Sequence, residues 1–385
     1  LLTIILTLNP SVYAQLSGNY TIGGHVGASN FATWTDFAQE FNKVGVSGKV
    51  QVTIQSNTSI SSCIELKQHS TYPTTATNTL VFTGNGYSVT GSITKELLLL
   101  NGADYIEIKN VKFVNSSNTD SIIGIRIANQ ADFISINGCT IQFNGSFNIA
   151  KSASAYIAFA DNNRNLLQTS SNHLGVNNTV KSCTLTTTAN NSPGPYYGIL
   201  HQGGIDSFKS VGTKNTFEGN NIQNFYTNAI FSRYSNGDRW LNNTITRSSA
   251  SSSSPVDSNL VVIKMGNSYS ASQSTLIFGN TITTLPFVGA TGTSKIRLNL
   301  FVGIELNQCD GTSATDFIIE GNTISHNVAY NYFEGITVLE GVKVIIKKNL
   351  LSYNRCYFNR FSYGFKILGT TDIVIVQNRI TKEIM

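Results

Sequence analysis

The chain has 385 residues, of which 41% are hydrophobic and 12% charged, and its formal net charge is +5. Soluble domains typically have roughly 25% charged residues, and no Lys/Arg-rich run occurs here, so nucleic-acid binding is not expected. The five cysteines are odd in number and irregularly spaced, which excludes a disulfide framework and a zinc-ligand pattern.

The N-terminal residues 1–14 resemble a secretory signal peptide. Leu1 to Leu8 are apolar but too few to span a bilayer, and Val12-Tyr13-Ala14 places small residues where a signal peptidase cleaves. Because neither Met nor a basic segment precedes the apolar run, this signal peptide is predicted to be truncated. No transmembrane segment is found later in the sequence, so we expect a secreted protein, extracellular or on the outer cell surface.

Residues 15–49 are predicted to form an N-terminal strand followed by a capping helix. Trp34, Phe37, Ala38 and Phe41 recur at the spacing of one helical face. Thr33 precedes them as an N-cap. An amphipathic helix at this position can cover the apolar end of a repetitive structure.

An imperfect hexapeptide repeat dominates the remainder, residues 50–385. Its pattern is apolar, any residue, small, Asn or Cys, small polar, apolar, as in Phe217-Glu-Gly-Asn-Asn-Ile222 and Ile319-Glu-Gly-Asn-Thr-Ile324. The fourth position of the repeat is occupied at residues 111, 139, 183, 220, 243, 280, 322, 349 and 378. Successive fourth positions are 23 to 44 residues apart. Sequence repeats with this spacing indicate a solenoid, whose units bury their apolar faces only against their neighbours.

Short alternating runs lie between the hexapeptides, for example Gly303-Ile-Glu-Leu306 and Gly335-Ile-Thr-Val338. They predict two or three short strands per coil, joined by tight bends. The predicted fold is all-β: a right-handed, single-stranded parallel β-helix with an N-terminal capping helix. The repeat continues to the last residues without a closing helix, so this β-helix is expected to be truncated at its C-terminal end.

The repeated Asn is predicted to form a ladder, because Asn tolerates a left-handed bend and can bond the backbone of the next coil. Cys139 and Cys183 occupy the same position, and we interpret them as free, packed thiols. Longer gaps between repeats place polar loops at 144–178, 186–196, 247–259 and 284–299.

The opening sequence resembles a known class of proteins. Gly18-Asn-Tyr-Thr-Ile-Gly-Gly24, Asn30-Phe-Ala-Thr-Trp-Thr-Asp-Phe37 and Gly45-Val-Ser-Gly-Lys-Val-Gln-Val-Thr-Ile54 are similar to the N-terminal region of large secreted bacterial β-helix proteins. Many of those carry a type IX secretion sorting domain. The resemblance implies the pectin-lyase-like fold, which hosts both polysaccharide-degrading enzymes and non-catalytic adhesins.

Stacking the alternating runs predicts one outward face that combines aromatic, amide and charged side chains. Arg233, Lys264 and Asn307 are placed in one row with Gln202, and Phe231 and Glu305 in the row beside it. Such a mixture suits carbohydrate binding. The alternative interpretation is an ordinary solvated sheet face, or one covered by the 247–259 loop. His201 falls on the inward register and is expected to be buried.

Evidence for catalysis is weak in the sequence. Calcium-dependent lyases need clustered carboxylates, but no two acidic residues are adjacent, and Asp-Asp, Gly-His-Gly, Arg-Ile-Lys and Asp-Pro-His segments are absent. If the chain is an enzyme, the candidate catalytic residues are Asp206, Asp238, Arg233 and Glu305.

Two functions are therefore considered. The preferred one is a non-catalytic surface module, adhesin-like or glycan-binding, that needs no metal or cofactor. The alternative is a lyase or glycosidase acting on an acidic polysaccharide, with Ca²⁺ as a cofactor in the lyase case. The expected partner is a polysaccharide or a cell-surface glycan, and the expected oligomeric state is a monomer.

Overall fold

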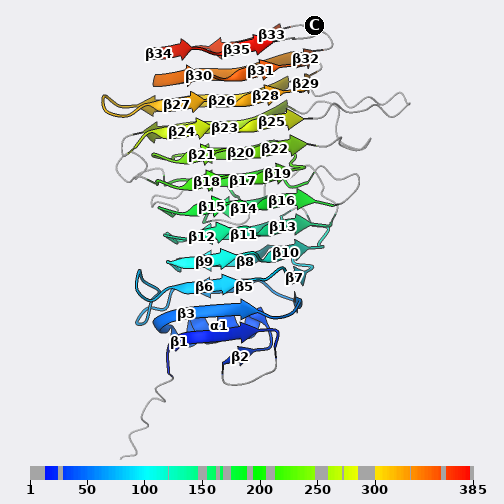
Figure 1. Cartoon of the computed structure of the whole chain (residues 1–385), viewed down its shortest axis with the longest axis vertical. Coiled ribbons are helices and arrows are strands. Elements are labelled where there is room, and N and C mark those ends of the chain that lie inside the picture. Colours follow the sequence, from blue (N-terminus) through cyan, green and yellow to red (C-terminus); the bar gives the residue numbers. More distant parts are fainter. Residues whose placement is uncertain are drawn as a thin grey trace, which may run out of the picture.

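The molecule is a stack of coils along one long axis, with the N-terminal strands at one end and the last repeats at the other (Figure 1). This computed structural model describes residues 14–24, 29–119, 121–145, 154–161, 165–167, 175–188, 194–204, 213–247, 259–270, 273–284, 300–329, 331–356 and 361–381. Residues 1–13 of the predicted signal peptide and much of the four predicted loops lie outside the described residues. Within the predicted 144–178 loop, Ala155–Phe159 form a buried strand, so that part of the prediction is wrong.

Three rows of parallel strands, here called faces A, B and C, run the length of the stack, and successive strands of the chain visit them in turn. Faces A and B are joined into one 22-stranded sheet, and face C is a separate 11-stranded sheet. Face A contains β5 (Ile64–Lys67), β8 (Glu96–Asn101), β11 (Ile123–Ala128), β14 (Ala155–Phe159), β17 (Tyr197–Gln202), β20 (Asn228–Arg233), β23 (Asn259–Ser270), β26 (Leu300–Gly311), β30 (Tyr332–Lys347) and β33 (Phe361–Ile367).

Face B also includes the second half of β30, which continues round from face A. Its other strands are β1 (Leu16–Ile22), β3 (Val46–Ile54), β6 (Leu80–Thr83), β9 (Ile106–Lys109), β12 (Ser135–Asn137), β15 (Thr179–Lys181), β18 (Thr216–Glu218), β21 (Arg239–Leu241), β24 (Thr275–Phe278), β27 (Phe317–Glu320) and β34 (Thr370–Val376).

Face C is the sheet that follows the tight bend of each coil. Its strands are β4 (Thr58–Ile60), β7 (Ser88–Gly91), β10 (Lys112–Asn115), β13 (Thr140–Phe143), β16 (Thr184–Thr187), β19 (Asn221–Gln223), β22 (Thr244–Arg247), β25 (Thr281–Thr284), β28 (Thr323–Ser325), β31 (Leu350–Ser352) and β35 (Arg379–Thr381). Two short pairs complete the set: β2 (Asn30–Phe31) lies beside β1, and β29 (Val328–Ala329) beside β32 (Arg355–Cys356). The prediction of a parallel β-helix is confirmed.

The core is a set of equivalent apolar side chains stacked from coil to coil. On face B, for example, Phe217, Trp240 and Ile277 are consecutive neighbours across β18, β21 and β24, and all three are fully buried. The rings of Phe217 and Trp240 stack with centroids 3.7 Å apart. Stacking of this kind fills the interior without a central sheet, so the core lengthens with each added coil.

The first coil is covered by the predicted helix, α1 (Trp34–Val44). Thr33 caps it: its hydroxyl accepts from the Asp36 N–H at 3.1 Å, and the Asp36 carboxylate accepts from the Thr33 N–H at 3.0 Å. Trp34 is fully buried and stacks 4.5 Å from Phe82 of β6. The helix thus places aromatic side chains over the open end of the apolar interior.

The bend between faces B and C is held by the repeated Asn residues, which are buried and linked from coil to coil. The backbone N–H and the side-chain amide of Asn280 both donate to Oδ1 of Asn322, at 2.9 and 3.0 Å. The Asn280 amide also donates to the Trp240 carbonyl of the preceding coil, at 2.9 Å. The same bonds recur at Asn220, Asn243, Asn322 and Asn349.

Cys139 and Cys183 continue this column toward the N-terminus as free thiols. The Cys183 Sγ donates to the Ile136 carbonyl at 3.5 Å, and the Cys139 Sγ donates to the Ile108 carbonyl at 3.4 Å. Each thiol therefore contacts the carbonyl that the Asn amide contacts in later coils. A small side chain with one weak donor is enough at this end of the column.

Candidate functional site

The predicted binding residues do lie on one side of the stack, on the outward surface of face A. One row of cross-strand neighbours runs Leu200, Phe231, Lys264, Glu305, and the next row runs Gln202, Arg233, Gly266, Asn307. Lys264 was predicted in the row of Arg233 and Asn307, which is wrong: it lies between Phe231 and Glu305. The row of Arg233 contains Gly266 at that point.

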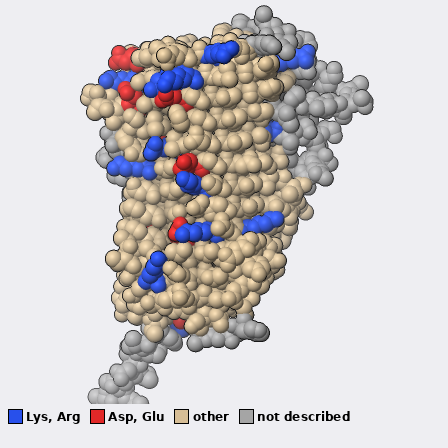
Figure 2. All heavy atoms as spheres, viewed as in Figure 1, with Lys and Arg blue, Asp and Glu red and all other residues tan. Residues whose placement is uncertain are grey.

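The acidic residues of this row and its neighbours are paired with basic ones. Lys264 Nζ lies 2.8 Å from Glu305 Oε1, and the Glu305 side chain is only 11% exposed. Two further acid–base pairs lie before and after it on face A, where Glu96 contacts Arg126 at 3.0 Å and Glu334 contacts Lys366 at 2.6 Å. Figure 2 shows one face of the molecule, on which charged side chains are few and most acidic ones lie beside basic ones.

Arg233 is held in place by its neighbours. Its Nε donates to Gln202 Oε1 at 2.8 Å, and its Nη2 donates to the Leu167 carbonyl. Its guanidinium carbon also lies 5.2 Å from the centre of the Tyr234 ring. A guanidinium fixed in this way presents its remaining donors in one orientation, as a binding site requires.

Part of face A is covered by a second, smaller apolar cluster outside the sheet. Leu166 is buried against outward side chains of β14 and β17, Ala158 and Leu200 among them. Phe231 packs at the margin of this cluster, with its ring 5.6 Å from that of Tyr197. The open part of face A, as we call its partly exposed residues, therefore runs from Phe231 over Lys264 and Gly266 to Asn307, and Glu305 is buried within it. Gln202, predicted to bind ligand directly, is fully buried and serves to position Arg233.

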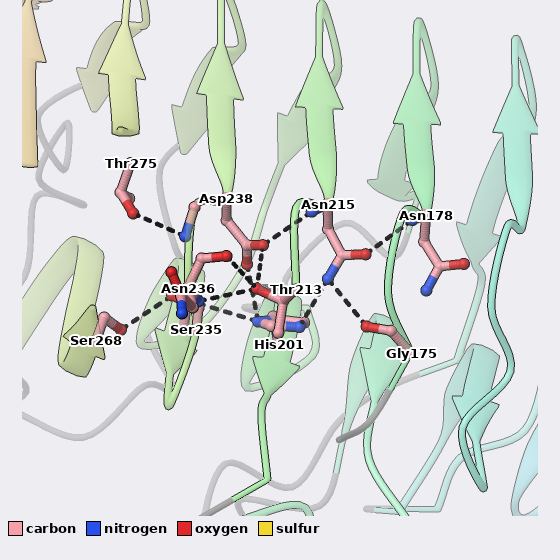
Figure 3. Close-up of polar contacts among 12 residues, drawn as sticks. Gly175, Asn178, His201, Thr213, Asn215, Ser235, Asn236, Asp238, Ser268 and Thr275 are labelled. Atoms are coloured by element: carbon pink, nitrogen blue, oxygen red, sulfur yellow. Dashed lines mark hydrogen bonds and ion pairs between the residues drawn. The ribbon is translucent and has the colours of Figure 1, made fainter. Parts of the chain in front are cut away.

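Asp238 does not lie on this surface. It is fully buried at the start of β21, in a polar cluster with His201, Thr213 and Asn215 (Figure 3). Its Oδ1 accepts from the Thr213 hydroxyl at 2.6 Å and from the Asn215 N–H at 2.9 Å. Asp238, a candidate catalytic residue only if the chain is an enzyme, is therefore shielded from solvent. Asp206 lies outside the described residues.

The buried acid belongs to a second polar column, in the turn from face A to face B. Asn178 Oδ1 accepts from the Ile134 N–H at 2.7 Å, and Asn215 Oδ1 accepts from the Asn178 N–H at 2.8 Å. In the next coil Asp238 Oδ1 accepts from the Asn215 N–H in the same way. Sequence reasoning missed this column, although each member stands two residues before a buried side chain of face B.

His201 completes the cluster, and its inward orientation was predicted. Its Nε2 lies 3.0 Å from the Asn215 amide nitrogen, and its Nδ1 lies 3.1 Å from Asp238 Oδ2 and 3.2 Å from Ser232 Oγ. Because an amide nitrogen can only donate, Nε2 accepts and the ring proton is on Nδ1. Ser232 and Asp238 share one ring nitrogen and all three side chains are fully buried, so this is not the arrangement of a nucleophilic triad.

The cluster should make stability depend on pH. Burial, the largest effect, lowers the pKa of His201 below 6.5, and the Asp238 carboxylate opposes this. The unfolded chain then binds more protons than the folded one, so the free energy of unfolding should fall as the pH drops below about 6.5. We expect His201→Gln to flatten that part of the profile, measured by urea unfolding from about pH 7 to 5.

Asp238 contributes to the pH dependence of the free energy of unfolding with the opposite sign to His201. Burial raises its pKa above 3.8, opposed by His201, Thr213 and Asn215. The folded chain then binds more protons, so this contribution to stability grows as the pH falls through the raised pKa toward 3.8. Asp238→Asn removes this titratable group and should remove its contribution to the pH profile. The structure accommodates Asn at this position, since Asn178 and Asn215 fill it in the two preceding coils. A His201→Gln profile that runs parallel to the wild-type profile would contradict a buried neutral imidazole.

The described residues contain no group of three His, Cys, Asp or Glu side chains that could hold a metal ion. In the same part of the chain, no helix has the length and hydrophobicity needed to cross a membrane.

No protein-family model matches the sequence, and a search of curated proteins also finds no match. Among solved structures, the chain is similar to the GH136 lacto-N-biosidase from Eubacterium ramulus, with a TM-score of 0.44 and 10% identity over 94% of this chain and 67% of that one. It is also similar to tailspike protein 3 of bacteriophage CBA120, with a TM-score of 0.42 and 9% identity over 86% and 53%.

A third similar structure is PfbA, a surface adhesin of Streptococcus pneumoniae, with a TM-score of 0.38 and 10% identity over 91% of this chain and 95% of that one. These similarities concern general architecture, and the fold assignment rests on the strand register described above.

Proposed function

We propose that this protein is a secreted or cell-surface module that binds a glycan without cleaving it, on the open part of face A. The observation that carries the proposal is the surface made by β20, β23 and β26, where Phe231, Arg233 and Asn307 stand around the Lys264–Glu305 pair. Neighbouring strands are about 4.8 Å apart, so these groups can contact successive parts of one extended ligand.

The pairing of the carboxylates favours binding over catalysis. A general acid or base needs a carboxyl group that can exchange a proton with the substrate. Glu305 is paired with Lys264, and Asp238, the other described candidate, is buried inside the coil. A paired Glu can still accept hydrogen bonds from sugar hydroxyls.

The proposed location rests on the sequence alone. Residues 1–14 have the pattern of a signal peptide, and the resemblance of the opening sequence suggests export by a type IX system. N-terminal sequencing of the mature protein tests this part separately, since cleavage after Ala14 is expected.

The binding test uses purified protein on immobilised pectate, alginate, glycosaminoglycan and neutral glycans, with and without Ca²⁺. We expect retention on at least one of them, with no new reducing ends and no unsaturated uronate. Phe231→Ala and Arg233→Ala should each weaken that binding roughly tenfold, the effect of losing one well-placed aromatic or guanidinium contact.

Matched controls lie on other surfaces of the same molecule. Tyr87, 38% exposed and just before β7 of face C, controls for the loss of an aromatic ring. Arg239, exposed on face B, controls for the loss of a guanidinium. Retention that Tyr87→Ala or Arg239→Ala reduces as strongly would place the ligand elsewhere. Cleavage of any glycan would overturn the non-catalytic proposal.

A further inference from the structure

The outward surface of face B changes in character along the stack. From β9 to β21, one row of cross-strand neighbours is polar: Glu107, Ser135, Thr179, Thr216 and Arg239. Over the next four coils the same row is aliphatic: Leu276, Ile318, Ile345 and Val374. Water-facing positions of a sheet are normally polar, so the change calls for an explanation.

These side chains point outward and are accessible to solvent. Their chain neighbours Ile277, Ile319 and Ile346 are fully buried inside the coil, whereas Leu276, Ile318 and Ile345 are half-buried. In the last described coil both Val374 and its neighbour Ile375 are exposed, at 45% and 43%. Phe278 and Val376, in the adjacent row, are 40% and 43% exposed. We call these six residues the apolar strip: Leu276, Phe278, Ile318, Ile345, Val374 and Val376. Single exposed apolar residues are common, but a continuous row across four coils marks an interaction surface.

The adjacent row shows which partner would fit. It runs Phe278, Glu320, Lys347, Val376, with Glu320 and Lys347 3.3 Å apart. Lys348, next to Lys347 in the chain, also lies 3.3 Å from Glu320. The order is apolar, negative, positive, apolar. Reversal of this row end for end therefore places each charge opposite its counter-ion and each apolar residue opposite an apolar one.

We propose that the apolar strip is the interface of a homodimer, in which two copies pack face B against face B with their long axes antiparallel. A two-fold axis along the strands, between β27 and β30, places Glu320 opposite Lys347 of the second copy and Ile318 opposite Ile345 of the second copy. The charges of Glu320 and Lys347, which lie between Phe278 and Val376, are complementary to themselves in this arrangement and select a second copy over an unrelated protein. This departs from the monomer expected from the sequence.

Sedimentation velocity of the purified full chain over a range of protein concentrations tests the proposal. We expect a reversible monomer–dimer equilibrium, and we expect Ile318→Lys to raise the dissociation constant by roughly tenfold or more by placing a charge in the apolar contact. Thr179→Lys, in the polar part of the same row, is the matched control and should leave the equilibrium unchanged. Wild-type protein that stays monomeric at every concentration would overturn the proposal.

Charge exchange tests the two-fold arrangement itself. Glu320→Lys should weaken the dimer, because it places a second positive charge opposite Lys347 across the axis. The double variant Glu320→Lys/Lys347→Glu should restore it, since both the pair within each copy and the pair between copies are regenerated. Failure of the double variant to restore association would exclude this arrangement.

Another apolar surface could also drive association. Ile375 and Ile380 in the last described coil are 43% and 48% exposed, although their equivalents in earlier coils lie in the core. End-to-end stacking through these residues would be sensitive to Ile380→Lys and insensitive to Ile318→Lys. That result would refute the side-by-side dimer, and the reverse result would support it.

Discussion

Replacement of Asn322 by Ala should lower the free energy of unfolding by about 3–6 kcal/mol, because several buried polar groups lose their partners at once. Asn322 Oδ1 accepts both the backbone N–H and the side-chain amide of Asn280. Its own amide donates to the Ile277 carbonyl at 2.8 Å and to Asn349 Oδ1 at 2.9 Å. Water cannot replace these bonds, since Asn322 is fully buried.

Denaturant unfolding measures the total effect, and native-state hydrogen exchange locates it. We expect the loss of protection to be greatest in β24, β27 and β30, because each coil contacts only its neighbours. Thr281→Ala is the control: Thr281 is exposed and lies next in the chain to Asn280. A destabilisation below about 1 kcal/mol for Asn322→Ala would mean that the polar column contributes little to the stack.

Truncation of Trp240 to Ala should destabilise the protein by about 3–5 kcal/mol, the usual range for a large aromatic removed from a packed core. Trp240 is fully buried and stacks on Phe217 at 3.7 Å between ring centres. The coils above and below are held at the strand spacing by their hydrogen bonds, so they cannot move in to fill the cavity.

The Trp240→Phe variant distinguishes the contribution of the stacked aromatic ring to stability from the contribution of the indole N–H. The Trp240 N–H has no acceptor among the described residues, so its removal relieves a buried unpaired donor while a stacked ring is kept. We expect Trp240→Phe to lie within about 1.5 kcal/mol of wild type in thermal or urea unfolding. Equal losses for the Phe and Ala variants would show that the volume of the indole, more than its stacking, stabilises this position.

The repeat was enough to predict the fold, because its apolar and Asn positions have different and fixed roles in each coil. The helix over residues 34–44 was also predictable, since Thr33 and the spacing of Trp34, Phe37 and Phe41 are local signals. Interior positions such as Ile199 and Ile304 followed from strict alternation, and both are fully buried.

The binding surface was harder to predict, for physical reasons. The segment before Lys264 is continuously apolar, and Leu260, Val262 and Ile263 are all buried, so alternation gives no inward and outward assignment there. Lys264 was placed in the wrong row as a result. The covering of face A by Leu166 could not be seen either, because that residue lies in a mostly polar insertion.

Asp238 illustrates a different difficulty. An isolated acidic residue near a strand end looks like a surface group, and only its offset from Trp240 indicates otherwise. Asn178 and Asn215 stand at the same offset from Val180 and Phe217, which relates all three to one interior column. Comparison of equivalent positions between coils is therefore more informative in such proteins than the chemistry of single residues.

The direction of the backbone hydrogen bonds has a mechanical consequence. They run between coils, along the long axis, so tension applied between the two ends is carried by every interface between coils in series, and one interface can open while the others hold. The coil from Asn220 to Asn243 spans 23 residues and would release about 80 Å of chain on opening. Pulled from its two ends, the molecule should therefore lengthen in steps, with each step the length of one coil.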